Sequence, residues 1–272
     1  MSKVEDEKIT SAANRLIKLS RSLHRRQKRD ETGLYLVEGI RPLEEALDAG
    51  VTLKFILYVP QVTGKVRGRD LLAKAKNAGI PCYQVTENLL VQLSFTETPQ
   101  GVIAVVQKQR YDFSLLLTRP DSFLLLVDGV QDPGNMGTMV RTAAAAGVHG
   151  VILTRGAVDL YNDKTLRATM GAVFQVPVVE DVPTEEAVEC LRDAGIRLVA
   201  GDVSGKLTYF EGSFTGRVAI AVGNEGAGVS RTVLAAAAEI VKIPLLGPAE
   251  SLNVAVATGI LLYEAVRQRS SR

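Results

Sequence analysis

The second half of the chain alternates short apolar runs with longer segments whose apolar residues recur at helical spacing. The apolar runs are expected as strands at 123–127, 150–154, 176–179, 197–200, 218–222 and 239–243. The periodic segments are expected as helices at 136–146, 164–173, 185–194, 231–238 and 252–269. Strands that are apolar along nearly their whole length, and that alternate with helices, are typical of a parallel sheet covered on both faces. The pattern therefore predicts an α/β fold for this half.

The first half carries a smaller α/β pattern. Strands are expected at 33–38, 55–59, 82–85 and 102–106, and helices at 41–49 and 70–78. Gly50 and Gly79 follow these two helices, as glycine commonly does at a helix end. The polar segment that ends at Pro120 is typical of a linker. We therefore expect a first domain at 1–108, a linker at 109–120 and a second domain at 121–272.

Composition narrows the class of protein. The chain has 272 residues, of which 46% are hydrophobic and 23% charged, which is typical of a globular protein. No apolar run approaches the roughly 18–20 residues that span a bilayer, and the first residues lack the apolar stretch of a signal peptide. Cys82 and Cys190 lie far apart, and only His24 and His149 are present, which excludes a histidine-rich metal site. We expect a cytoplasmic protein with no metal and no membrane partner.

The near-neutral net charge of +2 conceals an asymmetry along the chain. Residues 1–120 carry 19 Lys and Arg against 13 Asp and Glu, a charge of +6, whereas residues 121–272 carry 13 against 17, a charge of −4. Residues 14–29, hereafter the basic segment, contain no acid and these bases: Arg15, Lys18, Arg21, Arg25, Arg26, Lys28 and Arg29. Such a density of positive charge favours an anionic partner, most simply the phosphate backbone of RNA. The alternative is a solvated amphipathic helix that packs Leu16, Leu19 and Leu23 inward, and both interpretations can hold together.

A glycine-containing loop follows the first strand of the second half. Residues 132–137 contain a proline, two glycines and Asn135, and they lead into a helix that carries Arg141. The N-terminus of such a helix offers free N–H groups to an anion. Arg141 has few charged neighbours on its helix, so it is a candidate for binding a substrate. An ordinary surface or salt-bridged arginine remains the alternative.

Two further loops carry unusual residues. Three glycines surround Glu225 in the segment 223–228, which lets the backbone approach a ligand closely. This segment matches neither a Walker loop nor the GxGxxG dinucleotide motif. The stiff segment 243–253 contains two prolines, Ser251 as a possible N-cap and Asn253, which could reach a substrate or cap the helix locally. The helix that follows is apolar all round, which predicts burial in the core or in a subunit interface.

Taken together, the three loops resemble the SpoU (TrmH-like) branch of the SPOUT RNA 2′-O-ribose methyltransferases. The matching motifs are Asn135-x-Gly137-x-x-x-Arg141-Thr142-Ala143, then Gly223-Asn224-Glu225-Gly226, then Ile243-Pro244 with Glu250-Ser251-Leu252-Asn253-Val254-Ala255. This match covers roughly residues 121–272. A looser match, carried by Leu36-Val37-Glu38-Gly39 and Gln100-Gly101-Val102, makes residues 33–106 similar to the L30e-like RNA-binding domain of the family.

The resemblance implies S-adenosylmethionine-dependent methylation of a ribose 2′-hydroxyl in RNA. It also implies a mostly parallel α/β-knot domain with a deep trefoil knot, preceded by a smaller L30e-like α/β domain, and a homodimer formed through the C-terminal domain. By position, Gly223, Ile243 and Leu252 would hold the methyl donor. The positions that match the family's catalytic and substrate-placing residues are Asn135, Arg141, Glu225, Ser251 and Asn253.

The chemistry of the reaction limits what these residues can do. A ribose hydroxyl is a poor nucleophile until its proton leaves or its developing charge is stabilised. Guanidinium is effectively always protonated, so we expect Arg141 to stabilise the alkoxide and hold the adjacent phosphate, which could accept the proton. Glu225 would orient Arg141 or the donor pocket, and Ser251 and Asn253 would place the ribose.

Other classes of protein fit less well. A nicotinamide-dependent oxidoreductase would need GxGxxG after the first strand of its sheet, which residues 128–133 do not supply. A non-catalytic RNA-binding protein would not need three elaborate loops. The two-domain layout resembles that of the family's ribosomal-RNA members rather than that of its single-domain tRNA members, which implies ribosomal RNA, most simply 23S rRNA, as the substrate. A tRNA enzyme of the same family is the nearest alternative.

Overall fold

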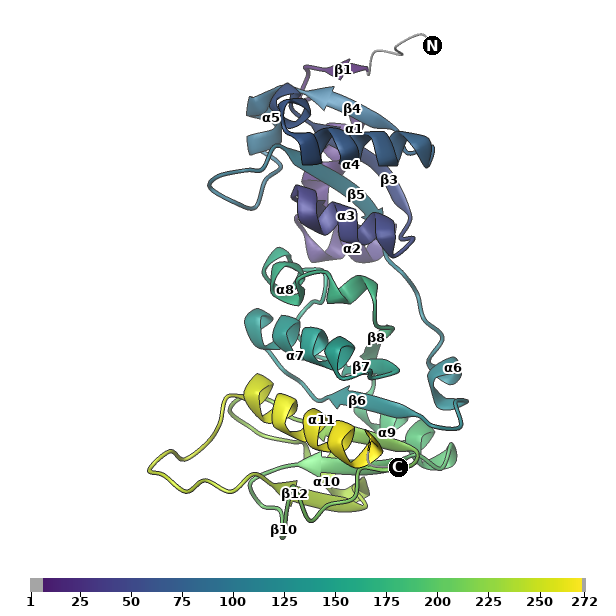
Figure 1. Cartoon of the computed structure of the whole chain (residues 1–272), viewed down its shortest axis with the longest axis vertical. Helices are drawn as coiled ribbons and strands as arrows, with labels where there is room; N and C mark the ends of the chain where they lie inside the picture. The colour runs from purple at the N-terminus through teal and green to yellow at the C-terminus, as the bar shows by residue number, and fades with distance from the viewer. Residues whose placement is uncertain (1–6, 271–272) are drawn as a thin grey trace. The chain divides into compact units, whose positions relative to one another are not determined.

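The structure is a computed structural model that describes residues 7–270, and it divides into two compact units at Gln109 and Arg110 (Figure 1). In the first unit the elements are β1 (Lys8–Ile9), α1 (Arg15–Ser22), α2 (Arg26–Thr32), β2 (Leu34–Glu38), α3 (Ile40–Asp48), β3 (Leu53–Tyr58), η1 (Pro60–Gly64), α4 (Val66–Asn77), β4 (Cys82–Val85), α5 (Glu87–Val91) and β5 (Val102–Gln107). Their strands form a mixed five-stranded sheet in the order β1-β4-β3-β5-β2. The predicted small α/β module is therefore present.

In the second unit the elements are α6 (Phe113–Leu117), β6 (Phe123–Val127), α7 (Pro133–Ala145), β7 (Gly150–Thr154), α8 (Asp163–Thr169), η2 (Ala172–Phe174), β8 (Val178–Val182), α9 (Thr184–Asp193), β9 (Arg197–Gly201), β10 (Leu207–Thr208), β11 (Val218–Val222), α10 (Arg231–Ala236), β12 (Glu239–Lys242) and α11 (Val254–Ser270). The strands form a seven-stranded sheet in the order β10-β12-β9-β11-β6-β7-β8, and each neighbouring pair is parallel. The predicted α/β fold with a parallel sheet is confirmed.

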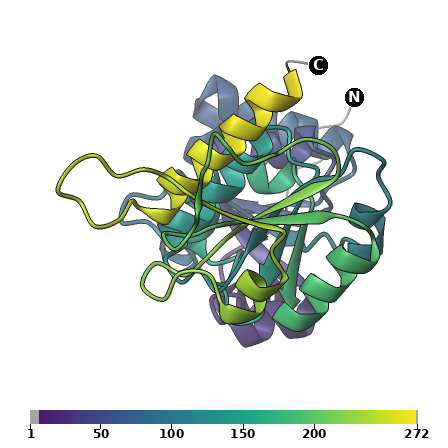
Figure 2. The same cartoon turned by 90° about the horizontal axis from the view of Figure 1, so that it is seen from below.

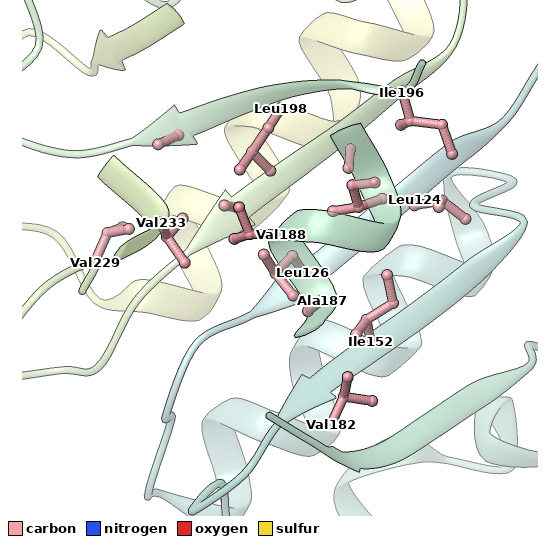
Figure 3. Packing of buried hydrophobic residues seen from close by; sticks show 14 of the residues in the cluster. Leu124, Leu126, Ile152, Val182, Ala187, Val188, Ile196, Leu198, Val229 and Val233 are labelled. Carbon is pink, nitrogen blue, oxygen red and sulfur yellow. The ribbon is translucent and has the colours of Figure 1, made fainter. Parts of the chain in front are cut away.

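Helices cover both faces of this sheet, with α9 and α11 on opposite sides of its strands (Figure 2). On one face, Leu124 and Leu126 of β6 pack with Ala187 and Val188 of α9, in a buried apolar cluster that extends to Val233 of α10 (Figure 3). The next residues along the strands face the opposite way. Thus Ala200 of β9 belongs to this cluster, whereas its neighbour Gly201 approaches the side chain of Leu261 on α11. Helix α11 packs along α7, and α7 packs along α8, on that second face.

The connection between the domains is more ordered than the sequence suggested. Residues 113–117 of the expected linker at 109–120 form helix α6, and Leu116 is buried in the apolar cluster of the second unit. This part of the chain therefore belongs to the second unit. The linker expectation was wrong here because the short apolar run of α6 lies within a largely polar segment.

Two helical expectations also need correction. The basic segment was expected as one amphipathic helix, but it is broken into α1 and α2 around residues 23–25, and Leu16 and Leu19 are only half-buried. The last helix begins at Val254 rather than at residue 252. The core covers only part of its surface, which leaves the expected subunit interface as the cover for the rest. Val256 and Tyr263 on α11 are 53% and 51% exposed.

Candidate active site

Three loops that follow parallel strands meet at one side chain, Asn135. Its Nδ2 donates to Oε1 of Glu225 at 3.0 Å, and its Oδ1 accepts from Nδ2 of Asn253 at 2.8 Å. The three residues follow β6, β11 and β12 respectively. Because the carboxyl ends of parallel strands share one edge of a sheet, residues distant in sequence can meet there. We call Asn135, Glu225 and Asn253 the three-loop junction.

Glu225 fixes the loop after β6. Besides the bond from Asn135, it accepts hydrogen bonds from the backbone N–H groups of Gln131 at 3.1 Å and Asp132 at 3.0 Å. Burial raises the pKa of the Glu225 carboxyl, but the hydrogen bonds from Asn135, Asp132 and Gln131 together outweigh burial and hold this pKa below its usual value. The carboxylate therefore remains charged at neutral pH. Within residues 7–270 its hydrogen-bond partners do not include Arg141, so of the two expected roles, orienting Arg141 or the donor pocket, the first is corrected: Glu225 orders the segment that carries Asn135 beside the cavity.

The start of α7 is built to present Asn135. Pro133 occupies the first turn, and Oδ1 of the N-cap residue Asp132 accepts from the backbone N–H of Asn135 at 2.7 Å. Proline and an acidic N-cap are both favoured at this end of a helix. Gly137 serves packing, because a Cβ there would lie 2.4 Å from Cβ of Ala168 on α8.

Asn253 rather than Ser251 caps the last helix. Its Oδ1 accepts from the backbone N–H of Ala255 at 2.9 Å and of Val256 at 3.3 Å, while its Nδ2 binds Asn135. The expected N-cap role of Ser251 is therefore wrong, because the helix starts two residues later than predicted. Ser251 is exposed and lines the cavity described below.

Arg141 lies between one and two turns further along α7 from Asn135. Its side chain is exposed, and within residues 7–270 it makes no hydrogen bond or ion pair. It is not part of the three-loop junction, although it shares a helix with Asn135. A free guanidinium on this helix is available to an anionic ligand.

A cavity of about 540 Å³ lies beside the junction and includes Gly223, Ile243 and Leu252 in its wall. Its volume is in the range of small-molecule sites. Gly223 is required by the backbone, since a Cβ there would lie 2.2 Å from the carbonyl carbon and oxygen of Gly228. Three carboxylate residues, Asp202, Glu225 and Glu250, line the cavity, which suits a ligand with positive charge.

Two residues of this region were missed by the sequence reasoning. Asn224 orders the glycine loop, because its Oδ1 accepts from the N–H groups of Gly226 and Ala227 and its Nδ2 donates to the carbonyl of Gly129. Asp202 lines the cavity directly after β9. Asp202 could have been predicted from its position, because β9 was predicted and polar residues at the carboxyl end of a parallel strand are candidates for a ligand site.

Sequence comparisons extend this local picture to the whole chain. The profile of the SpoU rRNA Methylase family matches residues 122–263, and that of the MRM3-like substrate binding domain matches residues 14–104. The chain belongs to the SpoU rRNA methylase family. The resemblance seen in the three loops is thereby confirmed.

Two curated relatives and one solved structure illustrate this membership in the SpoU family. The chain is 38% identical to the 23S rRNA (guanosine(2553)-2′-O)-methyltransferase of Bacillus subtilis, over 94% of this chain and 98% of that protein. It is 36% identical to the 23S rRNA (uridine(2479)-2′-O)-methyltransferase of Streptomyces viridochromogenes, over 97% and 93%. The crystal structure of the SpoU methyltransferase AviRb from Streptomyces viridochromogenes in complex with AdoMet superposes with a TM-score of 0.84 at 35% identity, covering 95% of this chain and 99% of that one.

In this SpoU family member the basic segment is only partly available to a ligand. Arg15, Lys18 and Arg25 are exposed, and Arg21 donates to Oε1 of Gln92 at 2.5 Å. Arg26 pairs with Asp30 at 3.6 Å and Lys28 with Glu31 at 2.5 Å, so acids just beyond the segment neutralise its end.

Arg29 departs from the expectation of RNA binding. It is 6% exposed, and its Nη1 donates to the carbonyl oxygens of Leu23 at 2.7 Å and His24 at 3.0 Å. These carbonyls lie at the break between α1 and α2, so Arg29 stabilises the turn instead of facing solvent. It is removed from the set of candidate RNA-binding residues.

Within the described residues 7–270 there is no group of three or more His, Cys, Asp or Glu side chains that could hold a metal ion. Over the same residues, no helix has the length and apolar character required to cross a membrane.

Proposed function

We propose that this protein transfers the methyl group of S-adenosylmethionine to a ribose 2′-hydroxyl of ribosomal RNA. The observation that carries the proposal is the three-loop junction, where Glu225, Asn135 and Asn253 form one hydrogen-bonded chain beside the cavity. The free guanidinium of Arg141 stands on the helix that starts at this junction. The two curated relatives named above act on 23S rRNA, which supports large-subunit rRNA as the substrate.

The cavity has the chemistry that S-adenosylmethionine needs. Its glycine loop allows close backbone approach, and its carboxylates match a ligand that carries a sulfonium cation. Gly223, Ile243 and Leu252 would hold the donor along this wall. When bound, the donor supplies an electrophilic methyl group, and the protein supplies the orientation of the acceptor.

Arg141 would act on the acceptor side. As the 2′-hydroxyl loses its proton, negative charge develops on the oxygen, and a guanidinium placed against it lowers the barrier. The same side chain can hold the neighbouring phosphate with a second N–H, and that phosphate can take up the proton. A guanidinium is effectively always protonated, so Arg141 stabilises charge and does not act as the base.

The other site residues would position the RNA substrate and would take no direct part in the methyl transfer. Asn135 has both ends of its amide occupied, by Glu225 and Asn253, so it fixes the geometry of the loops around the acceptor. The exposed hydroxyl of Ser251 at the cavity edge is available to the ribose. The exposed bases Arg15, Lys18 and Arg25 of the first unit would bind the RNA backbone.

The exposed face of α11 supports a homodimer through the second unit. Val256 and Tyr263 are half-exposed on this face, and Leu252 just before the helix is 38% exposed. Exposed apolar side chains of this kind commonly mark an interface. Light scattering on the purified protein should give twice the chain mass, and Tyr263→Asp should give the monomer.

Methyl transfer from radiolabelled S-adenosylmethionine to rRNA and tRNA transcripts tests the function. We expect label in 23S rRNA, on a ribose 2′-oxygen, and no 2′-O-methyl change in tRNA when the gene is deleted. Label in tRNA alone would make the protein a tRNA methyltransferase. Tight RNA binding without any transfer, and without bound donor, would make it a non-catalytic RNA-binding protein and overturn the proposal.

A further inference from the structure

Asp202 lines the cavity but lies outside the three loops that carry the family motifs. It follows directly on β9, next to β11 in the sheet. The last paired residues of these strands are Ala200 and Ala221, so the register carries Asp202 to the level of Gly223 at the carboxyl edge of the sheet. An acid and a glycine loop thus stand at the ends of two neighbouring parallel strands.

The position of Asp202 is fixed by its surroundings. Its backbone N–H donates to the carbonyl of Val241 at 2.9 Å, and its own carbonyl accepts from Gly205 at 3.0 Å. Oδ1 accepts from both the backbone N–H of Ser204 at 2.9 Å and the Ser204 hydroxyl at 2.7 Å. Gly205 packs against β12 so closely that a Cβ would lie 2.7 Å from the carbonyl carbon of Val241. The carboxylate is therefore held before any ligand arrives.

The second carboxylate oxygen of Asp202 is available. Oδ2 faces the glycine loop, 3.1 Å from where a Cβ of Gly228 would lie, and no donor within residues 7–270 reaches it. Glu225, by comparison, already accepts three hydrogen bonds from the loop after β6 and the first turn of α7. Asp202 is thus the carboxylate of the cavity that combines a fixed position with an open acceptor.

We propose that Oδ2 of Asp202 accepts a hydrogen bond from a ribose hydroxyl of the adenosyl group of the methyl donor. In parallel sheets that bind nucleotides, an acid at the end of the strand beside the glycine loop binds a ribose hydroxyl. The same placement occurs here on β9 and β11, although the glycine motif differs. The inference rests on the proposed function, because it requires that the cavity binds S-adenosylmethionine.

Calorimetry with the full chain tests the role of the carboxylate. Asp202→Asn keeps an oxygen for Ser204 and replaces the open acceptor by an amide, so we expect about tenfold weaker binding. S-adenosylmethionine and its product S-adenosylhomocysteine, which lacks the sulfonium charge, should lose affinity equally, because both carry the ribose. A loss confined to S-adenosylmethionine would assign Asp202 to the sulfonium charge instead and would overturn the inference.

Glu211→Gln is the matched control. Glu211 accepts from the backbone N–H and hydroxyl of Thr208 at 2.8 and 2.7 Å, as Asp202 does from Ser204, but it does not line the cavity. Its replacement should leave both affinities unchanged. Equal losses in the two variants would indicate a general effect of removing a local carboxylate and would contradict the assignment.

Modified ligands give a readout that does not depend on the variant folding. The wild-type protein should bind either the 2′-deoxy or the 3′-deoxy form of S-adenosylhomocysteine about tenfold more weakly than the parent compound. Asp202→Asn should reduce this discrimination. Equal binding of all three compounds by the wild type refutes the ribose contact, whereas failure of the wild type to bind any donor refutes the proposed function itself.

Discussion

At the scale of the residue, Glu225 shows how one carboxylate can order the loops of a site. It accepts from two backbone N–H groups and from Asn135, which in turn binds Asn253. These bonds hold its pKa below the usual glutamate value, against the opposing effect of burial. The folded state therefore binds this proton less readily than the unfolded state does.

That pKa difference predicts a pH-dependent contribution to stability. A carboxylate with a depressed folded-state pKa stabilises the fold above its unfolded pKa, and the contribution is lost as pH falls through the folded pKa. Glu225→Gln should therefore lower the unfolding temperature at pH 7, and the gap to wild type should close as the pH falls below the ordinary glutamate value of 4.5. Thermal unfolding between pH 7 and pH 3 measures this.

Glu250→Gln provides the control for this series. Glu250 is exposed on the loop before α11 and has no hydrogen bond or ion pair within residues 7–270. Its replacement should shift the unfolding temperature little at any pH. A constant gap for Glu225→Gln across the pH range would show that its hydrogen bonds do not depend on ionisation.

Arg141 is exposed, as Glu225 is, but unlike Glu225 it has no hydrogen-bond or ion-pair partner in the described structure. Arg141→Ala should therefore leave both stability and donor affinity near wild type, while kcat falls by about 100-fold or more, as for the loss of one charge-stabilising donor. Calorimetry and single-turnover transfer assays separate these effects. Arg192→Ala, which removes an exposed arginine of α9, should leave kcat unchanged, and loss of donor affinity in Arg141→Ala would reject its assignment to the acceptor.

At the scale of the element, strands were predicted better than contacts between loops. The ranges 123–127, 150–154 and 218–222 agree with β6, β7 and β11, because mainly apolar runs of about five residues bounded by turns have the length of a strand rather than of a helix. The two-residue strands β1 and β10 and the five-residue helix α5 were missed, since such short elements carry no recognisable period.

In the site, likewise, the individual residues could be predicted from local sequence, but the contacts between them could not. Asn135, Glu225 and Asn253 were identified as candidates from their loops, but their contacts span 90 and 118 residues of sequence. Only the strand order brings these loops together, and hydrophobic pattern does not give strand order. The burial of Arg29 was likewise hidden, because its partners are backbone carbonyls exposed by a helix break.

The glycine loop after β11 provides a prediction at this scale. Gly223→Ala would place a Cβ 2.2 Å from the backbone of Gly228, and backbone on both sides cannot move away without opening the loop. We expect at least tenfold weaker donor binding and a lower unfolding temperature. Gly226→Ala is the matched control in the same loop, because its Cβ would lie 3.7 Å from Oδ1 of Asn224, an ordinary contact. Equal behaviour of the two variants would contradict a backbone role for Gly223.

At the scale of the whole molecule, charge divides the two tasks of an RNA methyltransferase. The net charge of +2 is the sum of +6 over residues 1–120 and −4 over residues 121–272. An acidic unit suits a cationic donor but repels RNA, so affinity for RNA should come from the basic unit. The family profiles follow the same division, with a substrate-binding domain at 14–104 and the methylase domain at 122–263.

The salt dependence of RNA binding tests this division. Each phosphate contact that is lost reduces the slope of log affinity against log salt by about 0.7 to 0.9. Replacing the exposed Arg15 and Lys18 by Gln should therefore flatten the slope by about 1.5 and leave donor affinity unchanged. Arg29→Gln should affect stability and not RNA binding. It leaves the carbonyls of Leu23 and His24 without their donor, so the free energy of unfolding should fall by about 1–3 kcal/mol. The slope should stay at its wild-type value in that variant. An unchanged slope in the double variant would show that Arg15 and Lys18 contact no phosphate and would contradict their assignment to RNA binding.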